Sequence, residues 1–479
     1  MLFNSLSYLL FFPLVVVLYY IMAHRYRWAL LLAASSLFYM AFVPAYILIL
    51  YGTILLDYVI GIQLEQAKGR RRNYLLYLSI IANIGVLAVF KYFNFFTTNF
   101  NAMFEAMGLH FSLPVLNILV PLGLSFHTFQ ALSYTIEIYR GQQKAERHLG
   151  IYALYVLFFP QLVAGPIERP QNMLHQYREK KSFNPTMTLS GLRLILWGYF
   201  KKVVIADRIS MFVDTVYQNY SEMNQVYLIL AALAFVIQIY GDFSGYSDIA
   251  IGSARILGIN LMVNFDRPLF SKNITEFWRR WHISLSTWFK DYIYQPLAFH
   301  WRNAGIHGVA SALLITFIAS GLWHGAGWNF FIYGLLYGAV LCFELYTKNQ
   351  RKIVRKRLPA WLYSGLSIGL TFIVVSMIQI FFRATSLEDA VSFISHMIQS
   401  SDQHIVPYIN EGALSFGLYS YIIVIATSMI MFFLEHKYDF NFTSLDTRFK
   451  TDIAVSSIIL FLIITLGVFN QKSFIYFQF

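Results

Sequence analysis

Long apolar runs that recur along the whole chain limit its fold more than any other feature. Four of them lie at 5–23, 74–92, 361–382 and 451–469, and several more lie between these. A helix needs about 20 mainly apolar residues to cross a bilayer, and on that criterion we expect roughly eleven to thirteen spans. The sequence therefore predicts an all-α polytopic integral membrane protein.

The composition agrees with a chain that lives in lipid. Hydrophobic residues make up 58% of it and charged residues only 13%, whereas soluble globular proteins average about 45–50% and about 25%. The first apolar run has no basic stretch ahead of it and no small-residue cleavage site after it, so we interpret it as a retained span. Without an internal repeat or a linker, residues 1–479 are predicted to form a single membrane domain.

Positive charge is concentrated in short connections between the apolar runs. The net charge of +12 comes largely from two clusters, namely Lys68, Arg70, Arg71 and Arg72, and Lys348, Arg351, Lys352, Arg355, Lys356 and Arg357. Such clusters mark cytoplasmic loops and favour contact with anionic membrane lipids, which argues against a nucleic-acid partner. The acidic loop 401–412 contains no Lys or Arg and suits the opposite side.

One apolar run has basic sequence on both sides. Residues 149–165 lie between the basic segments 140–148 and 175–183, so both ends are predicted to be cytoplasmic. A re-entrant hairpin broken at Pro160 and Pro166 reconciles this, because non-helical backbone at membrane depth survives only inside protein or beside a water-filled cavity.

A second unusual segment, NITEFWRRWHISLSTWFKDYIYQPL, occupies residues 273–297. Asn273 followed by Glu276 has the spacing of a capping box, which predicts a helix start. Four large apolar residues recur at helical spacing and would share one face: Phe277, Trp281, Leu285 and Trp288. We therefore expect an amphipathic helix along the membrane interface. Its basic residues, Arg279, Arg280 and Lys290, supply a local positive field, although a helix that merely anchors the domain at the interface would also carry them.

Two histidines stand out against this apolar background. His282 follows Trp281, and His324 lies in GLWHGAGWNF, residues 321–330. Ionisable residues inside membrane segments are costly and usually face a cavity or a pathway, although a hydrogen-bonded packing role is the alternative. The small residues around His324 allow a substrate or another backbone to approach closely. A buried neutral imidazole is also suited to act as a general base.

At these residues the chain resembles a known family. WRRWHISLSTWFKDYIYQPL and SGLWHGAGWNF, together with the segments 121–134, 158–170 and 241–259, are similar to the membrane-bound O-acyltransferase (MBOAT) superfamily. Within it, the branch of bacterial polysaccharide O-acetylases is most similar, and the D-alanine transferases are more distant. The resemblance implies a ring of about eleven tilted transmembrane helices, with re-entrant and interfacial helices, around a central pore.

The resemblance also implies an activity and its site. His324 matches the central catalytic histidine and His282 its companion. The implied acyl donor is acetyl-CoA, a substrate and not a resident cofactor, and the donor-binding candidates are Arg279, Arg280, Trp281 and Lys290. The implied product is an O-acetyl ester on an extracytoplasmic polysaccharide, such as an alginate-like exopolysaccharide or peptidoglycan. A periplasmic or surface SGNH-type acetyltransferase would complete the transfer, and the enzyme would reside in the bacterial cytoplasmic (inner) membrane.

The chain ends in FIYFQF, which contains no charged residue. An aromatic belt at the lipid interface is one explanation. The other is that Tyr476 serves as a transient acyl acceptor, because the tail resembles the tyrosine-containing C-terminal motif of a small partner peptide of the D-alanine transferase. A phenol near pKa 10 lies between a thiol and a sugar alcohol in acidity, so a tyrosyl ester would retain much of the transfer potential of a thioester.

Other readings remain open. A transporter or exporter could use His324 as a proton relay, and a catalytically inactive scaffold for polysaccharide synthesis is a third class, although no inverted repeat is evident. No metal site is expected, because the key histidines lack ligand partners at helical spacing. Asp242 and Asp248 suit either a cytoplasmic entrance or helix capping and packing. Cys342 is expected to pack as a small hydrophobe, and His127 to have a structural role.

Overall fold

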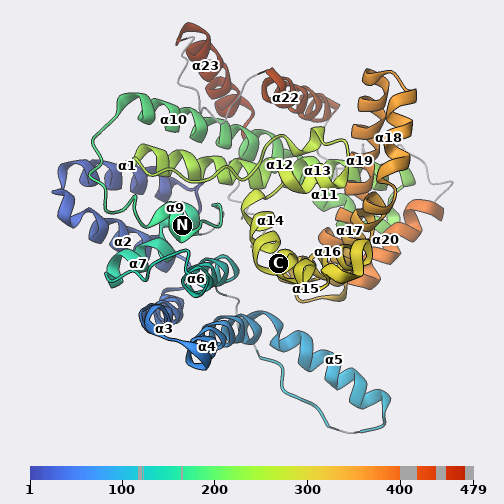
Figure 1. Ribbon diagram of the computed structural model, residues 1–479. Coiled ribbons are helices and arrows are strands. Elements are labelled where there is room, and N and C mark those ends of the chain that lie inside the picture. Colours follow the sequence, from blue (N-terminus) through green and yellow to red (C-terminus); the bar gives the residue numbers. More distant parts are fainter. Residues whose placement is uncertain are drawn as a thin grey trace. The chain divides into compact units, whose positions relative to one another are not determined.

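The computed structural model describes residues 1–109, 111–116, 121, 123–162, 165–399, 418–437 and 449–469, and within these residues the regular structure is entirely helical (Figure 1). The loop 401–412 and Tyr476 lie outside the described residues. The α-helices are α1 (Leu6–Ile21), α2 (His24–Met40), α3 (Ile47–Gln66), α4 (Gly69–Leu87), α5 (Phe93–Ala106), α6 (Leu124–Tyr139), α7 (Leu149–Leu157), α8 (Phe159–Leu162), α9 (Pro170–Met173), α10 (Pro185–Tyr199), α11 (Asp207–Gln218), α12 (Gln225–Ile256), α13 (Ile274–Arg280), α14 (Ile283–Phe289), α15 (Gln295–His300), α16 (Gly305–His324), α17 (Trp328–Tyr346), α18 (Lys348–Arg357), α19 (Ala360–Arg383), α20 (Leu387–Gln399), α22 (Leu418–Lys437) and α23 (Phe449–Leu466). Within the described residues, three π-helical stretches interrupt or extend these helices: Ala88–Tyr92, Phe200–Ala206 and Lys290–Tyr294.

Long apolar helices confirm the prediction of a polytopic membrane protein. Six helical stretches within the described residues are long and apolar enough to cross a bilayer: Pro44–Gln66, Gly69–Ala106, Gln225–Ile256, Arg302–His324, Trp328–Tyr346 and Ala360–Arg383. The predicted runs 74–92 and 361–382 fall inside two of them. The runs at the two ends of the chain form the shorter apolar helices Leu6–Ile21 and Ile453–Leu466. A total of about eleven spans and a central pore stay predictions.

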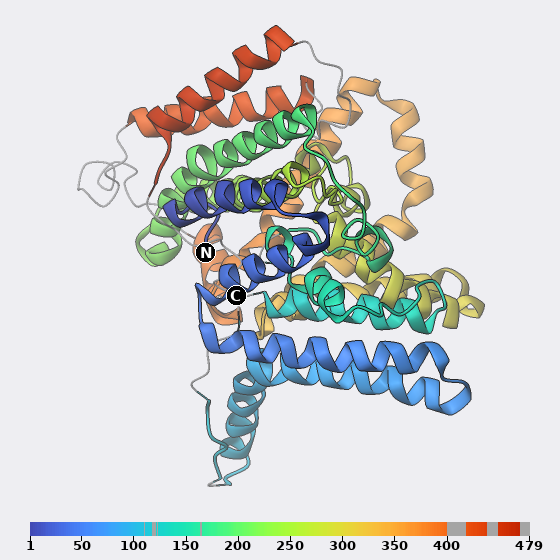
Figure 2. The same cartoon turned by 90° about the vertical axis from the view of Figure 1, so that its left-hand side faces the viewer.

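The described chain separates into two compact units, and helices α10 and α12 contribute residues to both. Unit 1 comprises residues 1–195 and 249–262, and unit 2 comprises residues 196–248 and 263–479. The single membrane domain stays a prediction. In unit 1, α3, α4 and α6 pack against one another, and α5 turns away from α4 beyond the π-helical stretch (Figure 2).

Polar side chains hold the α3, α4 and α6 interface of unit 1 together. The Asp57 carboxylate accepts hydrogen bonds from Ser79 Oγ at 2.6 Å and from Asn83 Nδ2 at 2.7 Å. His127 Nε2 lies 2.6 Å from Thr53 Oγ1. Such interhelical hydrogen bonds are the usual polar contacts between helices in lipid. The contact of His127 agrees with the structural role that we expected for it.

The chain does break within residues 149–165, but at Phe158 and not at Pro160, and the re-entrant hairpin stays a prediction. Helix α7 ends at Leu157, Phe158 leaves the helical conformation, and the short α8 carries Pro160 in its first turn. The Phe159 backbone N–H donates to Ser35 Oγ on α2 at 3.0 Å. This bond satisfies a backbone donor that the interrupted helix leaves over. Residues 163–164 lie outside the described range.

In unit 2, α16 and α17 form a tightly packed hairpin. A Cβ on Gly321 would lie 2.3 Å from the Phe330 carbonyl oxygen, and one on Gly334 would lie 2.3 Å from that of Phe317. Only glycine permits backbones to approach so closely. The sequence left open whether the small residues near His324 admit a substrate or another backbone. At Gly321 the close neighbour is the backbone of α17. The hairpin thereby places His324, the last residue of α16, beside the first turns of α17.

Candidate active site

His324 is buried in a box of aromatic rings. Its side chain is only 4% exposed. The ring centroids of Trp323, Phe382 and Tyr333 lie 4.9, 5.4 and 5.8 Å from that of the imidazole, each at a steep angle. These rings come from α16, α17 and α19, so three helices define the position of one titratable group.

His282 occupies a sharp break in the chain. Its backbone lies in the left-handed region, with φ 45° and ψ 55°, between α13 and α14. The expectation of one continuous amphipathic helix is therefore wrong, and its apolar residues are divided between two helices. The predicted start is confirmed, because Asn273 Oδ1 accepts from the Glu276 N–H at 2.8 Å. Positive φ is uncommon outside glycine and is often found at functional sites.

The His282 ring is completely buried and contacts the polar side chain of Asn264. Its Nδ1 lies 3.2 Å from Asn264 Oδ1, and the Phe243 ring packs against it with a centroid distance of 4.6 Å. Burial lowers the pKa of His282 to about 3, so the ring is neutral at physiological pH. His282 lies outside the six long apolar helices.

The fold brings the two histidines to the same indole. The Trp323 ring centroid lies 4.9 Å from that of His324 and 6.3 Å from that of His282. Far apart in sequence, these imidazoles thus share one aromatic neighbour, whose position follows from the end of α16. A pair of neutral imidazoles in such a setting can accept and return protons. Their catalytic roles stay predictions.

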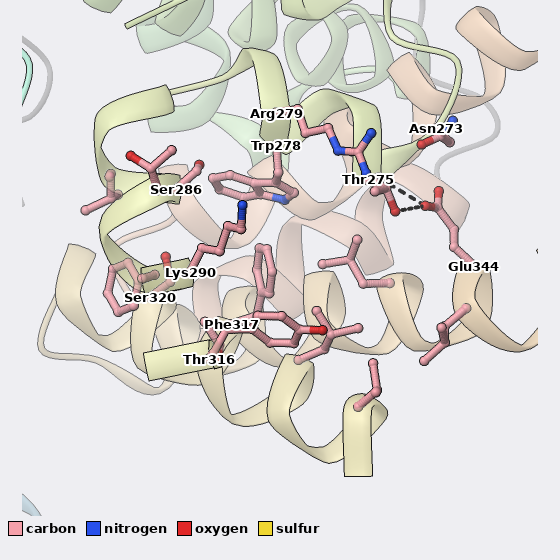
Figure 3. A pocket seen from close by; sticks show the side chains of 18 of the residues that line it. Asn273, Thr275, Trp278, Arg279, Ser286, Lys290, Thr316, Phe317, Ser320 and Glu344 are labelled. Atoms are coloured by element: carbon pink, nitrogen blue, oxygen red, sulfur yellow. Dashed lines mark hydrogen bonds between the residues drawn. The ribbon is translucent and has the colours of Figure 1, made fainter. Parts of the chain in front are cut away.

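A cavity of about 720 Å³ lies beside α16 and α17 in unit 2 (Figure 3). Its wall on α16 includes Val309, Leu313, Thr316 and Ser320, which cover about three turns of the helix. Ser320 is four residues before His324, so the two side chains lie on the same helix face about 6 Å apart along the axis. The lining includes Ser320 but not His324 itself. The cavity therefore ends one turn short of the imidazole.

Basic side chains line this cavity. Arg279 and Lys290, both expected to bind the donor, belong to its wall, as do Lys348 and Arg351 at the start of α18. Two other donor-binding candidates lie elsewhere, because Arg280 forms an ion pair with Glu276 at 2.7 Å and Trp281 is buried against the rings of Phe265 and Phe277. The structure thus separates the predicted donor residues into two that line the cavity and two that do not.

Sequence comparison identifies the family. The family model of the membrane-bound O-acyltransferases, MBOAT, matches residues 16–385. This chain belongs to the MBOAT family. It is 35% identical over 446 residues to the probable alginate O-acetylase AlgI of Pseudomonas putida, covering 90% of this chain and 87% of that protein. It is also 35% identical to the peptidoglycan O-acetyltransferase of Helicobacter pylori, covering 77% and 73%. The teichoic acid D-alanyltransferase of Bacillus subtilis is 29% identical, covering 54% and 67%.

Membership of the MBOAT family makes this multi-pass membrane protein an O-acyltransferase. The resemblance expected from the histidine-containing motifs is therefore confirmed. No observation supports the transporter that the sequence left open. Within the described residues, no group of three or more His, Cys, Asp or Glu side chains is arranged to hold a metal ion.

Two residues of this MBOAT site escaped the sequence analysis. Glu344 of α17 accepts hydrogen bonds from the Ile274 N–H at 2.7 Å and from the N–H and hydroxyl of Thr275 (Figure 3), and so caps the start of α13 from another helix. An acidic residue inside the apolar run 328–346 was a usable signal for it. Asn264, which contacts His282, lies in a stretch of sequence without any motif that would identify it as a site residue.

Asp242 and Asp248 form ion pairs with the buried lysines Lys202 and Lys201. Both lie inside α12, so neither caps a helix, and the capping alternative is wrong. Lys202 Nζ lies 2.5 Å from Asp242 and 2.8 Å from Asp207, and Lys201 Nζ lies 2.6 Å from Asp248. Pairing of this kind offsets the cost of removing charges from water. The geometry supports packing as the role of the two aspartates.

Proposed function

We propose that this O-acyltransferase takes an acetyl group from acetyl-CoA at the cytoplasmic face and transfers it, with His324 as general base, for O-acetylation of an extracytoplasmic polysaccharide. One observation carries the proposal, namely that a cavity with basic residues in its wall runs along α16 and ends one turn from His324. Pockets of about 300–1,000 Å³ hold ligands of this class.

Charge in the cavity wall supports a polyanionic donor. Lys348 and Arg351 belong to the basic cluster that the positive-inside bias assigns to the cytoplasm. They lie beside Glu344 at the end of α17 that is distant from His324. Figure 3 shows Glu344 and Thr275 at one edge of the cavity and Ser286 and Ser320 at the other. Phosphates at the basic end and a thioester near Ser320 would use the whole length of the cavity.

The transfer step balances without a co-reactant. The neutral His324 imidazole takes the proton from an acceptor hydroxyl while the hydroxyl oxygen attacks the thioester carbonyl carbon. A carbon–oxygen bond forms, the carbon–sulfur bond breaks, and the proton passes from the imidazolium to the departing thiolate. Acetyl thioester and alcohol thus become acetyl ester and thiol. General base catalysis of this kind contributes about 10²- to 10⁴-fold to a rate.

The acceptor side of the proposal draws on the relatives. The names of two of them state O-acetylation of alginate and of peptidoglycan, and an alginate-like exopolysaccharide or peptidoglycan is accordingly the acceptor class that we propose. An SGNH-type acetyltransferase in the periplasm or at the surface would complete the ester, and the enzyme would lie in the bacterial inner membrane. Tyr476 remains our candidate for a transient acyl carrier between the two.

Purified protein and radiolabelled acetyl-CoA test the function directly. Wild-type protein should release free thiol and pass label to an added hydroxyl acceptor, whereas His324→Ala should lose at least about 100-fold of this rate. His300→Ala is the matched control, because His300 is exposed at the end of α15. Equal activity of the His324→Ala and wild-type proteins would contradict the proposal.

The Tyr476 carrier has a separate test. After a single turnover without acceptor, label should be found on the C-terminal peptide of wild-type protein and be absent in Tyr476→Phe. Active protein with an unlabelled C-terminal peptide, or full activity of Tyr476→Phe, would exclude the carrier and leave the role of His324 untouched.

A further inference from the structure

Asn264 is the polar centre around which the chain near His282 is arranged. It is completely buried. Its Oδ1 lies 3.2 Å from His282 Nδ1 and accepts from the Ser284 backbone N–H at 3.2 Å and from the Ser284 hydroxyl at 2.9 Å. Its Nδ2 donates to Ser247 Oγ at 3.2 Å. One amide side chain thus contacts α12, the break at His282 and the first turn of α14.

The orientation of this amide follows from the contacts themselves. A backbone N–H can only donate, so the atom that faces the Ser284 N–H must be the amide oxygen. A flipped amide would set its NH₂ group against that donor. The Oδ1 atom is an acceptor only, and therefore His282 Nδ1 must carry the hydrogen in their shared contact.

We infer that Asn264 is a positioning residue that holds His282 as the Nδ1–H tautomer, with the lone pair on Nε2. In a neutral imidazole one nitrogen donates and the other accepts, so a donating Nδ1 leaves Nε2 as the acceptor. The low pKa caused by burial supports the neutral form. Outer partners fix the tautomer of functional histidines in the same way at metal sites.

Asn264 also holds the backbone that carries the ring. Its carbonyl oxygen accepts from the Ile283 N–H at 2.9 Å, directly after His282. A left-handed conformation at a residue other than glycine costs of order 1–3 kcal/mol and persists only where the surroundings enforce it. Main chain and side chain of Asn264 therefore act together, because one constrains the turn and the other constrains the imidazole.

The tautomer restricts the chemistry open to His282, and here the inference rests on the proposed function. An Nε2 lone pair can accept a hydrogen bond or a proton from a hydroxyl or a thiol. It cannot donate a hydrogen bond to the thioester carbonyl. His282 is thereby assigned to contact the acceptor hydroxyl or the thiol. Other hydrogen-bond donors must polarise the thioester carbonyl.

Two conservative changes separate positioning from folding. Asn264→Ala removes the acceptor, whereas Asn264→Asp keeps an acceptor for Nδ1 and can still contact the Ser247 hydroxyl. Ser247→Ala is the matched control, because it removes only the contact on the far side of the amide. Each purified variant is assayed for kcat and KM with acetyl-CoA, for thermal unfolding, and by ¹⁵N NMR of labelled histidine, with the His282 signal assigned through His282→Gln.

The expected results are specific. Wild-type protein should show the ¹⁵N signature of an Nδ1–H, Nε2-acceptor imidazole at position 282. Asn264→Ala should lose this signature and about 10- to 100-fold of kcat with little change in KM. Asn264→Asp should restore most of kcat, and its carboxylate should raise the pKa of His282 so that a new acid limb appears in the pH profile. Ser247→Ala should retain the signature and most of the activity.

Three outcomes would overturn the inference. They are an Nε2–H signature in wild-type protein, an unchanged signature and full kcat in Asn264→Ala, and an Asn264→Asp protein that is folded but as inactive as Asn264→Ala. Should His282→Gln itself prove fully active, the proposed role of His282 in transfer fails. The NMR signature still decides whether Asn264 fixes the tautomer.

Discussion

Two regions of unit 2 contain buried ionisable side chains, and the surroundings of these side chains differ. One region pairs them with opposite charges, and the other encloses them in aromatic rings. In the lysine region, Lys201 and Lys202 each face carboxylates at 2.5–2.8 Å, so opposite charges meet. In the histidine region, His282 and His324 are enclosed mainly by aromatic rings and share the Trp323 indole. Both regions are almost completely buried.

The surroundings determine the charge state that each buried side chain adopts. A buried lysine paired with carboxylates is locked in its charged state, because loss of one partner leaves an uncompensated charge. A buried imidazole is stable in its neutral form without an ionic partner, and this neutral form has the lone pair that can accept a proton. We therefore expect the lysine region to contribute to stability and the histidine region to carry the proposed chemistry.

The largest expected effect tests the chemical half of this comparison. His324→Ala should reduce acetyl transfer by about 10²- to 10⁴-fold, because it removes the proposed general base. Its melting temperature should fall only by the cost of the lost ring packing, since no charge loses its partner. Transfer rates and melting curves on the same preparation are the measurement. A variant that unfolds early would instead make His324 a packing residue.

Loss of a lysine tests the structural half. Lys202→Met should lower the free energy of unfolding by about 3–5 kcal/mol, because Asp207 and Asp242 are left buried without their cation. Whatever folded protein survives should still transfer acetyl. The melting temperature in detergent measures the loss, and the triple variant with Asp207→Asn and Asp242→Asn should recover much of it. Unchanged melting of Lys202→Met would remove the contrast between the two regions.

The cavity that leads toward His324 gives a smaller effect. Lys348→Ala combined with Arg351→Ala should raise KM for acetyl-CoA roughly tenfold, equivalent to about 1.4 kcal/mol, with kcat unchanged. The control pair is Arg355→Ala with Lys356→Ala, in the same helix but not in the cavity wall. Equal effects of both pairs would point to a general field of the basic helix and not to a donor site.

The last effect concerns the pH dependence of stability. Burial lowers the pKa of His282 to about 3 in the folded protein, against about 6.5 in an unfolded chain. Below pH 6.5 the unfolded state therefore binds a proton that the folded state does not bind. The free energy of unfolding consequently decreases as the pH falls. The slope is about 1.4 kcal/mol per pH unit between pH 6 and 4. His282→Gln should make the melting temperature less dependent on pH over this range, because one proton fewer is taken up on unfolding.

Much of the architecture could be read from local sequence. Apolar runs of sufficient length predicted the spanning helices such as α19, and Asn273 predicted where α13 begins. The motifs around His282 and His324 predicted the family. Each of these signals lies within a few turns of one helix, where periodicity and capping operate.

Other features depend on residues that are distant in the sequence. The helical spacing of Phe277, Trp281, Leu285 and Trp288 predicted one continuous helix, yet the chain breaks at His282. Asn264 contacts both the ring and the following backbone N–H, and this tertiary constraint overrides the local helical pattern. Lys348 and Arg351 gave a signal for membrane topology, and only the packing of α13 to α18 placed them in a cavity wall.

By itself, then, the sequence determined that the chain crosses a membrane as helices. The motifs around His282 and His324 determined that it is an acyltransferase. Tertiary structure alone decided which imidazole nitrogen faces an acceptor, which cations line the cavity and which carboxylates pair with lysines. Hydrophobicity and helix periodicity are local properties of the chain. Hydrogen bonds and ion pairs between remote residues exist only once helices have packed, because their energies depend on distances of a few ångströms.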